Sequence, residues 1–343
     1  MISVSKLLCD LDAEGDGLRY DAAEESDADQ IRERKQRRPV VVWNLTKQCN
    51  LYCEHCYAAA TDERALGELS TAEGKRLLDD LAGYGVPVDG LRERNNAFRG
   101  QEGAFDAAVR RIEACLDAGL KTGLRYTITD RTAPDLEDVV DFLYDVGVDR
   151  FCFYHLDYGG RGAAIRDADL DPEEKRRAVR RVCDMTREYH DRDEEMETLL
   201  VGNYCDAAYL VEYAREEFGP DTAERIRRYL RRNGGDPAGE RVADVDYQGN
   251  VHLTQFWQGY SLGNVRDRPF GAIWEDDSNP LLRALRERED HLTGKCADCR
   301  YRDVCRGASR LRSLAAHDHP FGPDPQCYLS EAEVSGSEVE IRG

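Results

Sequence analysis

Apolar positions along the chain switch between two spacings, and this alternation predicts strands and helices in turn. Runs rich in β-branched and aromatic residues are typical of strands, whereas apolar residues three and four positions apart are typical of one helical face. Strands that alternate with helices imply a parallel sheet, so the pattern favours the α/β class. The expected strands begin at Val40 and Val86 and occupy 123–129, 150–156 and 198–203, and the expected helices cover 70–81, 105–116, 136–144, 171–189 and 215–233.

The pattern changes near residue 240. Two short apolar runs, 242–246 and 250–257, flank Gln248-Gly249 and predict a β-hairpin, and a cysteine-rich tail follows. We therefore expect four parts in the chain. They are an N-terminal segment and connector at 1–38, a β/α domain at 39–239, a small cysteine-rich domain at 240–330 and a frayed tail at 331–343.

Acidic residues dominate the charge of the chain. It carries 68 acidic and 48 basic residues, a net charge of -20, which argues against nucleic acid and anionic membrane surfaces as partners. Only seven of the basic residues are lysines. An acidic, lysine-poor composition indicates adaptation to high salt, as in haloarchaea, where screening suppresses self-repulsion. An acidic cytosolic protein from a GC-rich genome is the alternative.

The N-terminus has no pattern typical of a secretory leader, and no apolar run approaches ~18 residues. We therefore expect a cytoplasmic protein without a membrane span. Cytoplasmic thiols stay reduced, so the twelve cysteines, where they cluster, are better interpreted as metal ligands than as a disulfide framework.

The strongest chemical signal is a C-x3-C-x2-C spacing in the loop after the first expected strand. Its thiols are Cys49, Cys53 and Cys56. A four-iron cluster takes four thiolates, so a site with three leaves one iron open to a non-protein ligand. Buried thiols that cluster by chance, or a zinc site completed by His55, are the alternatives.

A second group of thiols lies in the tail at a C-x2-C-x5-C-x21-C spacing. Cys296, Cys299, Cys305 and Cys327 are enough to close a site. The spacing alone suits either a structural zinc ion or a second iron-sulfur cluster, and the company of the first triplet favours iron-sulfur. The scattered thiols are predicted to be buried small hydrophobes: Cys9, Cys115, Cys152, Cys183 and Cys205.

One strand end carries candidate substrate contacts. His155 precedes a glycine-rich turn that contains Arg161, at the carboxyl end of the expected strand 150–156. Parallel β/α folds bind ligands at this end of their strands, and an arginine there could grip a carboxylate. A structural role for both residues is the alternative.

The residues Cys49–Tyr57 resemble the radical SAM superfamily, in which such a loop binds a 4Fe-4S cluster whose open iron is chelated by S-adenosylmethionine. The tail Cys296–Cys327 resembles a SPASM or twitch-type auxiliary-cluster domain, which implies a second 4Fe-4S cluster. Further segments resemble the tetrapyrrole-modifying branch of this superfamily, with didecarboxysiroheme deacetylase and NirJ-like proteins, and so imply a tetrapyrrole ligand and a role in haem or siroheme metabolism. These segments are Ile2–Cys9, Cys152–Leu156, Gly160–Gly162 and His252–Trp257.

The chain departs from this family after the first expected helix. Family members continue with a strand ending in a Gly-Gly-Glu-Pro motif that holds the methionyl amine, but here Val86–Val88 runs directly into Asp89-Gly90. At ~30 residues per strand-helix-strand unit, roughly two β/α units are absent. The resemblance therefore implies a shortened, partial barrel of parallel strands. It also implies two cofactor contacts, Arg125 at the carboxylate-binding position and the backbone of His55 against adenine.

Two hypotheses of function follow from this departure. The first is a pseudo-radical-SAM paralogue that keeps its clusters for electron transfer, tetrapyrrole carriage or partnership with a full-length radical SAM protein. The second is an active enzyme that cleaves S-adenosylmethionine and modifies a siroheme-derived tetrapyrrole, as a deacetylase or decarboxylase would. The first is favoured, because positioning a radical source needs a preorganised pocket.

Overall fold

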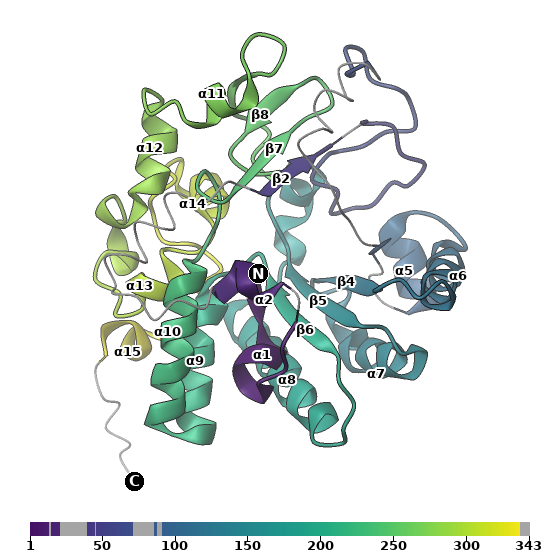
Figure 1. The fold of residues 1–343 in the computed structure, drawn as a ribbon, viewed down its shortest axis with the longest axis vertical. Helices are drawn as coiled ribbons and strands as arrows, with labels where there is room; N and C mark the ends of the chain where they lie inside the picture. The colour runs from purple at the N-terminus through teal and green to yellow at the C-terminus, as the bar shows by residue number, and fades with distance from the viewer. Residues whose placement is uncertain (14, 21–39, 45, 71–85, 88–90, 337–343) are drawn as a thin grey trace.

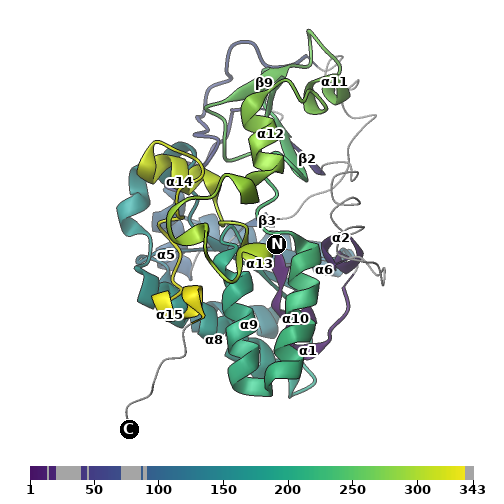
Figure 2. The same cartoon turned by 90° about the vertical axis from the view of Figure 1, so that its left-hand side faces the viewer.

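The computed structural model of the protein describes residues 1–13, 15–20, 40–44, 46–70, 86–87 and 91–336. Its described strands form two sheets, with helices around them (Figures 1 and 2). One sheet has five strands in the order β1-β6-β5-β4-β3, and the other has four in the order β2-β7-β8-β9. Within these residues, no helix combines the length and the apolar character needed to cross a membrane.

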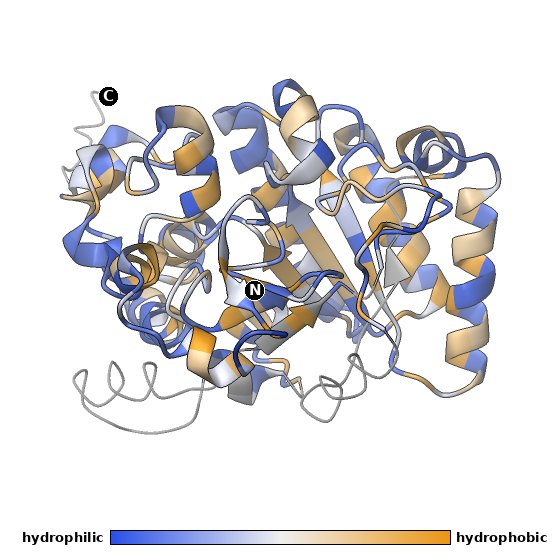
Figure 3. Cartoon of the chain, turned by 90° about the horizontal axis from the view of Figure 1, so that it is seen from above, coloured by the Kyte–Doolittle hydropathy of each residue, from blue (hydrophilic) through white to orange (hydrophobic). Residues whose placement is uncertain are grey.

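The five-stranded sheet confirms the expected parallel arrangement. β3 (Val86–Pro87), β4 (Gly123–Ile128), β5 (Arg150–His155) and β6 (Glu197–Val201) pair in parallel. β1 (Ile2–Ser3) adds an antiparallel edge beside β6. Apolar residues concentrate on the central strands and on the helix faces turned toward them, as Figure 3 shows. Burial of these faces is the main favourable contribution to the stability of this layer.

Helices accompany the strands in the expected order. Helix predictions over 105–116, 136–144 and 171–189 are confirmed, whereas the helix expected over 215–233 is two helices that meet at Gly219, where a proline begins the second. The helix expected over 70–81 lies, apart from Ser70, outside the described residues. The helices are α1 Val4–Cys9, α2 Asp16–Tyr20, α5 Arg92–Arg99, α6 Ala104–Asp117, α7 Leu136–Val146, α8 Pro172–His190, α9 Cys205–Phe218, α10 Pro220–Asn233, α11 Phe270–Trp274, α12 Pro280–Arg286, α13 Arg302–Cys305, α14 Arg310–His317 and α15 Glu331–Ser335, with short 3-10 turns at Ala133–Asp135, Gly160–Ala168, Arg288–Asp290 and Gly294–Cys296.

The strand in front of the thiol triplet belongs to the second sheet. β2 (Val40–Trp43) pairs in parallel with β7 (Val242–Val245), which lies about two hundred residues further along the chain. β7, β8 (Asn250–His252) and β9 (Ser261–Asn264) are antiparallel, so the hairpin expected around 248–249 is confirmed. Alternation of strands and helices predicts the order of elements but not their partners. The sheet to which β2 belongs therefore emerges only from the structure.

Buried arginines tie the C-terminal tail to the rest of the molecule. Arg312 pairs with Asp324 at 2.8 Å and donates to the carbonyl oxygen of Gly202, just beyond β6, at 2.9 Å. Arg288 donates to the carbonyl oxygens of Asp236 and Ala238 at 2.8 and 2.6 Å. A buried guanidinium with several partners fixes the segments that it joins, because each of its N–H groups has a direction. Arg312 therefore holds the tail at the carboxyl ends of β5 and β6, since it also donates to the carbonyl oxygen of Leu156 at 3.4 Å.

Candidate iron-sulfur sites

The loop after β2 carries the thiol triplet. Cys53 is buried, with 8% of its surface exposed, whereas Cys49 and Cys56 are half-buried. The Cys49 amide donates to the carbonyl oxygen of Thr61, and the Cys56 amide to that of Cys53. The Leu51 amide lies 3.5 Å from the Cys49 sulfur and donates to it. These bonds fold the triplet into a compact loop in which two of the three thiols reach the surface.

The C-terminal turn of α5 holds one side of this loop. The amides of Tyr52 and Glu54 donate to the carbonyl oxygens of Arg99 and Phe98, each at 3.3 Å. The ring of His55 stacks on the ring of Phe98, with centroids 4.8 Å apart. This stacking fixes the His55 backbone between two thiols of the triplet. Contact between that backbone and adenine stays a prediction.

Arg161 holds the other side of the loop. Its Nε donates to the Cys53 carbonyl oxygen at 2.8 Å, and one terminal nitrogen donates to that of Ala60 at 2.6 Å. Its own amide donates to the Cys56 carbonyl oxygen at 2.9 Å, and its guanidinium lies 4.4 Å from the ring centre of Tyr52. These contacts give Arg161 a role in positioning the triplet. Its predicted contact with a substrate carboxylate stays untested.

A glycine beside Arg161 makes this approach possible. Gly160 has φ +55°, and a Cβ atom there would overlap the carbonyl oxygen of Tyr57. Gly160→Ala should therefore displace the triplet loop and lower the iron bound there, besides costing ~1–2 kcal/mol for the left-handed backbone. The matched control is Gly103→Ala, because Gly103 has φ +76° but no atom within 4 Å of the added Cβ. Thermal melting should show a similar loss of stability in both variants, whereas iron analysis should show a loss only in Gly160→Ala. Equal iron content in both variants would contradict this.

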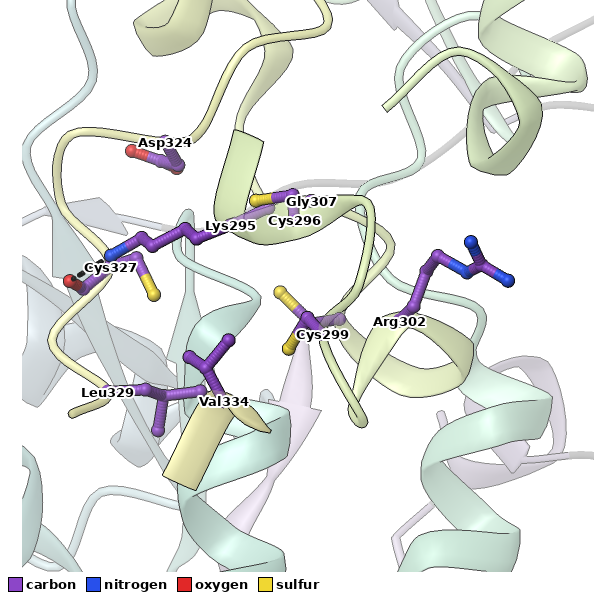
Figure 4. A pocket seen from close by; sticks show the side chains of 11 residues that line it. Lys295, Cys296, Cys299, Arg302, Gly307, Asp324, Cys327, Leu329 and Val334 are labelled. Carbon is purple, nitrogen blue, oxygen red and sulfur yellow. Dashed lines mark hydrogen bonds between the residues drawn. The ribbon is translucent and has the colours of Figure 1, made fainter. Parts of the chain in front are cut away.

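The tail thiols line a single pocket. Cys296, Cys299, Cys305 and Cys327 all contribute to its wall, and the close view shows the sulfur atoms of Cys296, Cys299 and Cys327 around one space (Figure 4). Cys305 is buried and the other three are half-buried. The surroundings are largely apolar, which limits access of water to whatever the thiols bind. The other lining residues are Lys295, Arg302, Gly307, Ala308, Asp324, Leu329 and Val334.

Burial keeps most of these thiols protonated in the absence of a bound cation. It raises the pKa of Cys305 well above its ordinary value and that of Cys299 to about 11. The pKa of Cys327 is lowered instead, because the neighbouring Cys205 side chain forms a hydrogen bond with it. Metal ions bind thiolates, so metal binding here would release protons and provide the charge that stabilises the deprotonated thiols. A donor set of four convergent thiols in an apolar pocket suits an iron-sulfur cluster.

The two remaining predicted contacts lie on the parallel sheet. Arg125 on β4 lies over Tyr154 of the neighbouring strand β5, with its guanidinium 5.5 Å from the centre of the tyrosine ring. His155, at the end of β5, is buried and bonds through Nε2 to Asp206 at 2.9 Å. Tyr328 of the tail donates to the same carboxylate at 2.6 Å. The structure thus gives His155 a structural role, because its hydrogen bond to Asp206 connects β5 with α9 and the tail. Its contact with substrate stays a prediction.

Three contributors to these sites were missed in the sequence. Arg99 bonds to the Cys53 sulfur, Cys205 contacts Cys327, and Asp206 joins His155 to the tail. Cys205 was expected to be a small buried hydrophobe, and it is fully buried, but beside a predicted ligand. No local spacing pairs these residues with their partners, which lie 46 to 122 positions away.

Comparison with known proteins connects these sites to a family. Residues 237–300 match SPASM, an iron-sulfur cluster-binding domain. The chain is 36% identical to Fe-coproporphyrin III synthase of Methanosarcina barkeri, over 97% of this chain and 99% of that protein. It is 31% identical to pre-heme d1 synthase of Dinoroseobacter shibae, over 89% of each chain.

Solved structures share the fold at lower sequence identity. SuiB of Streptococcus suis, crystallised with its precursor peptide SuiA, superposes with a TM-score of 0.65 at 15% identity, covering 88% of this chain and 79% of that one. The sequence likeness extends over nearly the whole length of relatives named for haem-type synthesis, and the fold is that of radical SAM proteins with a SPASM domain. The chain therefore belongs to the tetrapyrrole-modifying branch of the radical SAM/SPASM family.

Proposed function

We propose that this chain is an iron-sulfur protein of haem or siroheme-type tetrapyrrole metabolism with reduced or no cleavage of S-adenosylmethionine. One 4Fe-4S cluster would sit at Cys49, Cys53 and Cys56, and a second at the four tail thiols. The observation that carries this proposal is the sheet topology. Among the described strands, β2 and β3 are terminal strands of two different sheets, whereas a closed barrel would join them through further strands.

The length of the alignment with Fe-coproporphyrin III synthase supports the same proposal. The match to Fe-coproporphyrin III synthase extends over 395 aligned positions, whereas this chain has 343 residues. Some positions of that relative therefore have no counterpart here. The expected place is the region where Val86 runs into Asp89-Gly90, because there the sequence lacks the Gly-Gly-Glu-Pro strand that the family resemblance implies.

Missing strands would affect catalysis more than cluster binding. The triplet loop has its own supports in α5 and Arg161, and these lie outside the region where strands are expected to be absent. Cleavage of S-adenosylmethionine instead requires that the sulfonium be aligned with the open iron. A misplacement of about 1 Å can cost roughly 100-fold in rate. Loss of part of the cofactor's wall should therefore lower cleavage strongly while leaving the cluster in place.

The tail pocket supports a cluster rather than a single zinc ion. Its four thiols line one space, and four thiolates could bind either a zinc ion or an iron-sulfur cluster. The match of residues 237–300 to SPASM, an iron-sulfur cluster-binding domain, includes Cys296 and Cys299. This match favours a cluster.

An active enzyme is the second candidate, because the sequence likeness to Fe-coproporphyrin III synthase covers nearly all of both chains. In that case Arg125 and the His55 backbone would orient S-adenosylmethionine, and His155 or Arg161 would hold a carboxylate of a siroheme-derived tetrapyrrole. A full-length radical SAM protein or an electron donor is the partner expected in the first case. The second case also requires a one-electron donor, because cleavage of S-adenosylmethionine is reductive.

Anaerobic reconstitution followed by a cleavage assay tests the proposal. We expect about eight iron and eight sulfide ions per chain, as two 4Fe-4S clusters require. After reduction, release of 5′-deoxyadenosine should be at least roughly 100-fold slower than from the M. barkeri relative assayed side by side. Comparable rates would favour the active enzyme, and an iron content near zero would exclude both candidates.

A further inference from the structure

The buried guanidinium of Arg99 points at one thiol of the triplet. Its terminal nitrogen donates to the Cys53 sulfur at 3.3 Å, within the range of hydrogen bonds to sulfur. Arg99 is the last residue of α5, and only 5% of its surface is exposed. A charged donor in such a dry position interacts more strongly than one in water, because the local dielectric constant is low.

The backbone holds this contact in place. Arg99 and Phe98 accept hydrogen bonds from loop amides on either side of Cys53, and the Phe98 ring stacks on His55. Gly100 follows with φ +66°, and a Cβ atom added there would lie 3.2 Å from the Tyr52 carbonyl oxygen, so the helix ends against the loop. The guanidinium thus reaches the sulfur from a fixed helix end.

Arg99 differs in charge from two backbone amides that donate to predicted ligand sulfurs. The Leu51 amide bonds to Cys49 at 3.5 Å and the Tyr301 amide to Cys299 at 3.4 Å, and both donors are neutral. Arg161 contacts the same loop, but its bonds go to carbonyl oxygens. Of these donors, Arg99 alone brings a full positive charge to a thiol.

We propose that Arg99 raises the reduction potential of the cluster held by Cys49, Cys53 and Cys56; this inference rests on the cluster assignment proposed above. One-electron reduction adds a negative charge to the cluster and spreads it onto the sulfurs. A hydrogen bond from a buried cation stabilises that added charge more than the oxidised state, so reduction becomes easier. Arg99 is a positioning and tuning residue and not an iron ligand.

The test is a redox titration followed by electron paramagnetic resonance in wild-type protein and in Arg99→Gln and Arg99→Lys. The signal of the triplet cluster is the one absent from Cys49→Ala. We expect a lower potential for this cluster in Arg99→Gln, an intermediate value in Arg99→Lys, and no change in the tail cluster. Arg94→Gln is the matched control, because Arg94 lies on α5 and pairs with Asp135, away from the thiols.

An unchanged potential in an iron-replete Arg99→Gln would overturn the inference. Should that variant fail to bind iron, wild-type protein grown with ¹⁵N-arginine decides, since the reduced triplet cluster should show a coupling to an arginine nitrogen. Absence of that coupling also overturns the proposal. Iron and sulfide counts on the wild-type protein distinguish failure of this inference from failure of the proposed function. If the wild-type chain binds no cluster at the triplet, the proposed function itself is refuted.

Discussion

Replacing Cys296 and Cys299 together with alanine should halve the iron and sulfide of anaerobically reconstituted protein, from about eight to about four of each per chain. The two substitutions remove half of the thiols around the tail pocket, and Cys305 and Cys327 cannot hold a four-iron cluster by themselves. The triplet lies on a different loop and keeps its own supports. Colorimetric iron and sulfide assays, with electron paramagnetic resonance of the reduced protein, measure the result.

The control for this experiment is Cys115→Ala. Cys115 is a half-buried thiol on α6 that does not line the tail pocket, so its loss should leave iron and sulfide unchanged. Full iron content in the double variant would exclude the tail cluster. Zinc in wild-type protein, lost together with the two thiols, would instead identify a structural zinc site.

The sequence predicted the central layer of the fold well, because the relevant signals there are local. The expected strands 123–129 and 150–156 correspond to β4 and β5, and the helix between them to α7. α9 was missed over most of its length for the opposite reason. Its residues from Cys205 to Leu210 are all buried, so the helix lacks the polar face that produces a recognisable period.

Prediction of the sites had the same limit. Cysteine spacing alone indicated both groups of thiols, since ligands to one cluster often recur at short, fixed intervals. The pairing of β2 with β7, and the contact of Arg99 with Cys53, depend on segments that are distant in sequence. Tertiary packing brings these segments together, and no local pattern records it. The two groups of thiols were therefore recognisable in the sequence, and their supporting contacts were not.

Arg312→Met should destabilise the protein by about 3–5 kcal/mol. The side chains of Arg312 and Asp324 are 0% and 1% exposed and lie 2.8 Å apart. Burial alone would raise the pKa of Asp324, but the attraction of Arg312 outweighs it, and the pKa stays below the ordinary 3.8. The carboxylate is therefore charged at neutral pH, and without Arg312 it would be left buried and unpaired. Asp157 nearby would lose the same favourable cation.

Thermal melting followed by circular dichroism measures this effect, with iron content determined alongside to separate loss of clusters from loss of packing. We expect the midpoint to fall by several degrees. Arg177→Met is the matched control: its side chain is 67% exposed and lies 3.9 Å from Glu173, and such surface pairs contribute about 0–1 kcal/mol. A similar midpoint in both variants would contradict the importance of the buried pair.

The double variant Arg312→Met/Asp324→Asn separates the cost of an unpaired charge from the worth of the pair. The amides of Ser309 and Gln326 now donate to the two different carboxylate oxygens of Asp324, at 2.8 and 2.9 Å, and asparagine keeps one oxygen that can accept from one of them. No unpaired charge at position 324 then remains, so the double variant should melt above Arg312→Met. Recovery of this kind would mean that the large loss in the single variant comes mostly from the stranded carboxylate. The pair would then act chiefly to hold the tail pocket in one position against the strand ends, where the second cluster is expected to bind.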